Sequence, residues 1–102
     1  MITIFMYARA HKEKIEQFKA LAADATPLSR ADDGCLNYVF HQQADDPGNF
    51  VLTEQWRDRE ALEAHVRHLY EVYGPPAAGQ KLPKSIVDLC ESIEIKRFDV
   101  LA

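Results

Sequence analysis

Residues 35–56, CLNYVFHQQADDPGNFVLTEQW, decide the fold of this 102-residue chain. Residues 35–42 and 50–56 are rich in β-branched and aromatic side chains, which are typical of β-strands. Between them, residues 44–49 (ADDPGN) form a dense turn signal. A connection of six residues is short, so the two strands are predicted to pair as an antiparallel hairpin.

The segment before this hairpin predicts one strand and one helix. Residues 2–9 are again rich in β-branched and aromatic side chains, as expected for a strand. From about Lys12, apolar residues recur at helical spacing with charged residues between them. The pattern predicts an amphipathic helix that ends near Pro27 and the polar turn of residues 30–34.

The segment after the hairpin predicts a second helix and a last strand. Asp58 is a suitable N-cap, because its carboxylate accepts hydrogen bonds from free backbone N–H groups. The apolar stripe of this helix consists of Leu62, Val66, Leu69 and Tyr73. Residues 74–76 (GPP) are expected to end it, since proline breaks helices. Residues 82–90 suggest a short third helix, and residues 93–100 the last strand.

The order strand, helix, strand, strand, helix, strand predicts an α+β fold, the ferredoxin-like βαββαβ sandwich, as one domain over residues 1–102. Two main helices can cover only one face of its sheet. Apolar side chains nevertheless occupy both faces: Ile2, Ile4 and Met6 alternate with Phe5 and Tyr7, and Leu36, Tyr38 and Phe40 with Cys35 and Val39. An open apolar face is normally an interaction surface, so the chain is expected to form a homodimer through its sheets.

Composition and charge argue against several function classes. The 12 basic and 16 acidic residues give a net charge of −4, and the basic residues are scattered, so no nucleic-acid partner is expected. The apolar run of residues 4–8 is far shorter than a membrane span, so no membrane partner is expected either. The opening residues lack a secretory pattern, which predicts a cytoplasmic protein with Cys35 and Cys90 reduced.

Glu54 is the first candidate functional residue. It lies in the row Phe50, Leu52, Glu54 and Trp56, which the period of a strand places on one face. A carboxylate in such a row must find a hydrogen-bond donor or take a raised pKa. The alternative is a structural salt bridge, to Arg57 or to a partner chain.

His65 is the second candidate, because it lies about 60° from the centre of the helix stripe and faces the sheet or a cavity beside it. Its ordinary pKa near 6.5 makes it the best candidate proton acceptor, although a buried histidine is also a common packing residue. His68 is rotated further out and is expected to be solvated. Trp56 would line the same gap, or be an ordinary core residue. Asn37 is polar within a strand, as are many edge or dimer contacts.

Other chemistries lack support in the sequence. His65 and His68 diverge in orientation and have no convincing third ligand, so no metal is expected. There is no phosphate loop, no G-x-S-x-G and no dinucleotide fingerprint, so neither a nucleotide nor a flavin is expected. The residues alone lead to a dimer with a pocket lined by Trp, His, Glu and Tyr side chains.

The sequence resembles one known family. The resemblance rests on GCLNY at residues 34–38, Asp46-Pro47, FVLTEQW at residues 50–56 and EALEAH at residues 60–65. These segments are similar to the antibiotic biosynthesis monooxygenase (ABM) domain, and the resemblance extends from the first strand to about Val100. It implies a ferredoxin-like fold that dimerises as an α/β barrel. The family's activities include oxygenation of quinols and anthrones without metal or flavin, haem degradation and processing of a quorum-sensing signal.

Two departures from the family pattern stand out. A typical member continues after the family histidine with Thr-Pro-His, whereas this chain reads VRHLY at residues 66–70, with Tyr70 in place of the second histidine. Haem-degrading members carry an asparagine on the first strand. Residues 2–9 contain none, which argues against haem.

The resemblance therefore implies a cofactor-independent monooxygenase that uses O2 on a small phenol, quinol or anthrone. His65 would be the base, and Glu54 its orienter or a second proton acceptor. The remaining candidates would be two donors to oxygen atoms, Trp56 and Asn37, and two residues that line the pocket, Tyr38 and Tyr70. Two alternatives remain: a non-redox, isomerase-type enzyme for a hydroxylated carbonyl such as a signal molecule, and a dimer that binds a small molecule without catalysis.

Overall fold

The chain alternates strands and helices as βαββαβ in a computed structural model that describes residues 1–102. The elements are β1 (Ile2–Ala10), the 3₁₀ turn η1 (Lys12–Lys14), α1 (Ile15–Arg30), β2 (Cys35–Gln42), β3 (Asn49–Trp56), α2 (Arg59–Tyr73), α3 (Lys84–Val87) and β4 (Cys90–Phe98). The sheet order is β2-β3-β1-β4, with every pair antiparallel. The predicted α+β, ferredoxin-like fold is confirmed.

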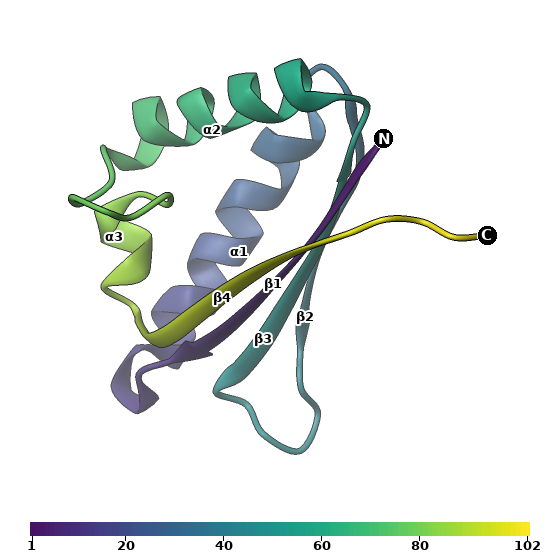
Figure 1. Cartoon of the computed structure of the whole chain (residues 1–102). Helices are drawn as coiled ribbons and strands as arrows, with labels where there is room; N and C mark the ends of the chain where they lie inside the picture. The colour runs from purple at the N-terminus through teal and green to yellow at the C-terminus, as the bar shows by residue number, and fades with distance from the viewer.

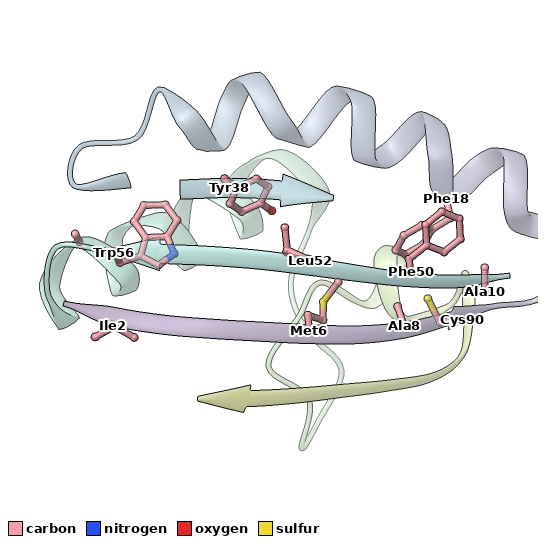
Figure 2. Close-up of a cluster of buried hydrophobic side chains, with 11 residues drawn as sticks. Ile2, Met6, Ala8, Ala10, Phe18, Tyr38, Phe50, Leu52, Trp56 and Cys90 are labelled. Carbon is pink, nitrogen blue, oxygen red and sulfur yellow. The ribbon is translucent and has the colours of Figure 1, made fainter. Parts of the chain in front are cut away.

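All helices lie on one side of the sheet, and the core fills the space between the two layers (Figure 1). Phe18 of α1 is fully buried, and the centroid of its ring lies 4.5 Å from the ring centroid of Phe50 on β3. Figure 2 shows Phe18 descending from α1 onto Phe50, with Tyr38 and Trp56 on the same side of the sheet. The strand alternation read from the sequence therefore sorts core from surface as predicted for β3.

The β2–β3 hairpin forms as predicted, but Leu36 on β2 does not face the core. Leu36 was expected to lie beside Tyr38 and Phe40, whereas its side chain is 56% exposed. The ladder shifts register between Cys35 and Asn37, because Cys35 pairs with Trp56 and Asn37 pairs with Gln55. A bulge of this kind leaves its extra residue unpaired and turns it out of the core.

Helix α1 continues past Pro27 and ends at Arg30, where the predicted polar turn begins. Proline removes one backbone hydrogen bond, to the carbonyl four residues earlier, and normally weakens the helix there. Here Ala25 and Ser29, on either side of Pro27, are almost completely buried. Packing of the last turn against the core keeps the chain helical past the proline.

Helix α2 begins and ends where the sequence indicated. The carboxylate of Asp58 accepts a hydrogen bond from the backbone N–H of Ala61, and Gly74 caps the other end. The following elements differ from expectation. Helix α3 is a single turn, and β4 spans 90–98 instead of 93–100, because Cys90 turns into the core and pairs with Ala10 across a register shift.

The face of the sheet that no helix covers carries an aromatic cluster of Phe5, Tyr7 and Phe98. The Phe5 and Phe98 rings lie 5.0 Å apart at 63°, and Tyr7 and Phe98 are exposed. Polar side chains surround this cluster, among them Asn37 and Thr53, which are hydrogen-bonded to each other. The expected second apolar face is thus present, interrupted by polar residues.

Two further features of the chain are clear. Cys35 and Cys90 are free thiols at opposite ends of the sheet, since Cys35 pairs with the end of β3 and Cys90 with the end of β1.

No helix in the structure is both long enough and apolar enough to span a bilayer.

Gly34 should be needed where the chain turns from α1 into β2. Its φ is +83°, and a Cβ there would lie 2.5 Å from the Cβ of Ala61. Gly34→Ala should therefore cost the left-handed strain of about 1–2 kcal/mol and a further ~1–3 kcal/mol for overpacking. Gly79 has a similar φ of +78° with open space around it, so Gly79→Ala should cost the strain alone. Urea unfolding of both variants measures the difference, and equal losses would contradict the contact with Ala61.

Candidate functional site

A cavity of about 390 Å³ lies between the sheet and the helices. Fifteen of its 19 lining residues are apolar or aromatic, and every main element contributes to it. The four exceptions are Glu54, His65, Lys81 and Arg97. An apolar cavity with a few polar groups is the usual form of a small-molecule site.

Glu54 lies on the sheet side of this cavity and is only 8% exposed. Its carboxylate accepts a hydrogen bond of 2.7 Å from the indole N–H of Trp56. Burial raises the pKa of Glu54 to about 7, and the hydrogen bond from Trp56 opposes this shift. Glu54 is therefore poised to gain or lose a proton near neutral pH.

His65 lies on the helix side of the cavity and is 3% exposed. Its ring stacks on that of Trp56, with centroids 4.3 Å apart and an angle of 28°. The ring of Tyr38 meets it edge-on at 5.6 Å. These two aromatic rings fix the orientation of the imidazole.

Asp32 is the carboxylate that binds His65. Its Oδ2 lies 2.9 Å from Nδ1 of His65, and its Oδ1 lies 2.7 Å from Nδ1 of His68. One carboxylate thus holds two imidazoles. With Asp32 ionised, Nδ1 of His65 carries the proton and donates it to Oδ2, which leaves Nε2 as the basic nitrogen.

Burial lowers the pKa of His65 below its ordinary value of 6.5, and the hydrogen bond to Asp32 only partly offsets this effect. The neutral form therefore predominates at neutral pH. A neutral imidazole with a free Nε2 beside an apolar cavity is able to accept a proton from a bound molecule.

The family of this chain follows from comparison with known proteins. The family model described as "Antibiotic biosynthesis monooxygenase" matches residues 1–70. The chain belongs to the antibiotic biosynthesis monooxygenase (ABM) family. Glu54, Trp56 and His65 lie within the matched residues, whereas Lys81 and Arg97 lie beyond them.

Three individual proteins illustrate what the chain is similar to. The Bacillus subtilis (strain 168) protein named "Putative monooxygenase YcnE" is 28% identical over 89 residues, which cover 87% of this chain and 93% of that protein. "Uncharacterized protein sll1783" of Synechocystis is 34% identical over 58 residues, which cover 57% of this chain and 40% of that protein. The crystal structure of PA3566 from Pseudomonas aeruginosa superimposes with a TM-score of 0.82 at 27% identity, over 99% of this chain and 94% of that one.

Not every residue expected at the ABM site lies in the cavity. Trp56 is fully buried and does not line the cavity. Its N–H is donated to Glu54 and its ring stacks on His65, so it holds these two residues from the core side. Asn37 lies on the uncovered face of the sheet, where its amide donates to Thr53. Neither side chain is placed to donate to a molecule in the cavity.

The contacts expected of Glu54 and His68 also differ from those in the structure. Glu54 makes no salt bridge with Arg57, which pairs instead with Asp33 and Asp58. Glu54 does not orient His65 either, because Asp32 does. His68 was expected to be solvated, but it is only partly exposed and shares Asp32.

Both tyrosines expected to line the cavity do so. Tyr38 is buried, and burial raises the pKa of its phenol well above the ordinary value, so it stays protonated. The hydroxyl of Tyr70 donates to the backbone carbonyl of Lys81. Tyr70 therefore holds the segment between α2 and α3 against the cavity.

The raised pKa of Glu54 has a measurable consequence. In NMR titration of the side-chain carboxyl carbons, Glu54 should titrate with a midpoint near pH 7, and its signal should be absent from Glu54→Gln. Because the folded protein holds this proton more tightly than the unfolded chain, wild-type stability should fall as pH rises from about 4.5 to 7, by about 3 kcal/mol relative to Glu54→Gln. A midpoint near 4.5, or a stability difference independent of pH, would contradict the burial of Glu54 without a cationic partner.

Proposed function

We propose that this ABM-family protein is a monooxygenase that oxidises an electron-rich phenol, quinol or anthrone with O2, without a flavin or a metal ion. The observation that carries the proposal is the Asp32–His65 pair at the wall of an apolar cavity. It supplies a proton acceptor where an aromatic molecule of modest size would bind. The name of the B. subtilis relative and the family membership support the same reaction class.

The proposed chemistry needs no external reductant. Removal of a proton from the substrate by Nε2 of His65 gives an electron-rich phenolate or enolate, which donates electrons to O2 and forms a carbon–oxygen bond. The O–O bond then breaks, so that one oxygen atom stays on the ring carbon as a quinone carbonyl and the other leaves as water. The substrate gains this oxygen, loses two hydrogens and is oxidised by four electrons, the number that O2 accepts.

Each side chain at the site has a proposed part in this sequence. His65 accepts the first proton, and Asp32 stabilises the imidazolium that forms. Glu54, which exchanges its proton near pH 7, supplies or accepts the proton that moves when the O–O bond breaks. Tyr38 and the apolar lining hold the aromatic rings and keep water away from the reacting carbon.

Substitution of the two histidines should separate catalysis from structure. His65→Ala should lower oxygen uptake with a responsive quinol or anthrone by on the order of 10²–10⁴, the usual contribution of a general base. His68→Ala removes an imidazole from the same helix and the same carboxylate but does not touch the cavity, so it should have a much smaller effect. Wild-type activity should rise with pH through the lowered pKa of His65, since the neutral imidazole is the working form.

An oxygen electrode and a panel of phenols, quinols and anthrones provide this measurement. Equal rate losses in the two folded histidine variants would remove His65 from the role of base. Absence of uptake above background with every member of the panel would overturn the monooxygenase proposal. Turnover that continues without O2 would favour a non-redox, isomerase-type reaction at the same base.

We also propose that the protein forms a homodimer through the uncovered face of the sheet, where Tyr7 and Phe98 expose aromatic surface. Light scattering at micromolar concentration should give twice the mass of the chain. Tyr7→Glu places a charge on this face and should yield monomers. Val72→Glu, at an exposed apolar residue of α2, should leave the dimer intact. A monomeric wild type, or equal effects of the two variants, would contradict this interface.

A further inference from the structure

Two solvent-exposed basic side chains line the largely apolar cavity without any acidic partner. Arg97 comes from β4 and Lys81 from the segment between α2 and α3. Neither side chain forms an ion pair or a hydrogen bond within the chain, although most other arginines and several lysines do. The site proposed above uses neither of them.

The register of the sheet fixes where Arg97 lies relative to the proposed reacting groups. Tyr38 pairs with Glu54, Glu54 with Ile4, and Ile4 with Arg97, so the four residues form one row across all four strands. All four line the cavity. Two strand spacings separate the backbones of Glu54 and Arg97, which is about 10 Å. The acid and the guanidinium therefore lie on the same cavity wall, with Ile4 between them.

Lys81 is brought to this cavity by specific contacts. Its backbone carbonyl accepts the hydroxyl of Tyr70, and an isolated bridge joins Pro76 to Pro83 on either side of it. The hydroxyl of Ser85 donates to the carbonyl of Tyr73. These contacts tie the backbone of the segment to the end of α2, so the fold places the exposed side chain of Lys81 beside the cavity.

The charge of the cavity is opposite to that of the whole chain. The chain carries a net charge of −4, but the cavity lining holds two cations and one acid. That acid, Glu54, is protonated for much of the time at neutral pH because its pKa is raised to about 7. A cavity with unpaired cations and no fixed anion favours an anionic ligand.

We propose that the substrate is an aromatic acid, whose carboxylate binds Arg97 and Lys81 while its phenolic or enolic end lies between Glu54 and His65. This inference rests on the proposed function and names its substrate class. Arg97 would act as the main carboxylate ligand, because a guanidinium offers two parallel N–H donors to a carboxylate. Lys81 would add a second positive charge from the opposite wall. Neutral phenols would bind without this anchor.

A matched pair of probes tests the proposal. The probe 6-hydroxy-2-naphthoate carries a phenol and a carboxylate at opposite ends of two fused rings, and its methyl ester has the same shape without the charge. Equilibrium dialysis at pH 6.5 under argon, where Glu54 is mostly protonated and the carboxylate of the naphthoate is ionised, measures the dissociation constants of both. The acid should bind about tenfold more tightly than the ester, which is the effect of one or two charge-assisted hydrogen bonds.

Three variants locate the carboxylate site. Arg97→Gln should abolish most of the preference for the acid, and Arg97→Lys should retain part of it. Lys96 is the matched control: it is the neighbouring cation on β4, but it faces the uncovered side of the sheet, where its amine lies over the ring of Tyr7. Lys96→Gln should leave the preference unchanged. Lys81→Gln should reduce it by a smaller factor than Arg97→Gln.

The outcomes distinguish this inference from the proposed function. Equal binding of acid and ester to the wild type, or equal effects of Arg97→Gln and Lys96→Gln, would overturn the anionic subsite whatever the reaction is. A preference for the acid that depends on Arg97, together with no oxygen uptake for any phenolic acid, would keep the subsite and overturn the monooxygenase proposal. Binding does not require turnover, so these measurements are independent of the reaction.

Discussion

The buried indole of Trp56 is the contact on which the rest of the site depends. Since the ring is fully enclosed, its N–H has to be paired inside the protein, and Glu54 is the acceptor. The face of the same ring supports His65. One core side chain thereby orients both titratable groups, so their separation is set by the packing of the sheet against α2 and not by a mobile loop.

Residues whose position follows from local periodicity were predictable from sequence. The period of two was enough to place Glu54 on the inner face, and the helix period was enough to turn His65 inward. The same alternation puts Asn37 opposite Tyr38, so the two could not both have lined one cavity. Leu36 does not follow this alternation because a bulge shifts the register of β2, and the nearby Gly34 and Asn37 are not enough to locate that bulge from the sequence.

Residues brought in by long-range contacts were not predictable in this way. Asp32 belongs to a polar turn that looks like any other, and it reaches His65 only because Gly34 brings the turn against the start of α2. Arg97 sits on a strand whose boundaries were misjudged, and its relation to Glu54 depends on the pairing of β4 with β1. Asp32 and Arg97 are therefore identified as residues of the site only from the three-dimensional structure.

The stacking of the only tryptophan on the proposed base has an optical consequence. An imidazolium in contact with an indole quenches its emission far more strongly than a neutral imidazole does. In Glu54→Gln, where the acid bonded to the indole no longer titrates, the emission of Trp56 therefore reports the protonation of His65 without a label and without substrate. The charge of the His65 imidazole can therefore be followed by stopped-flow fluorescence while a ligand enters the cavity.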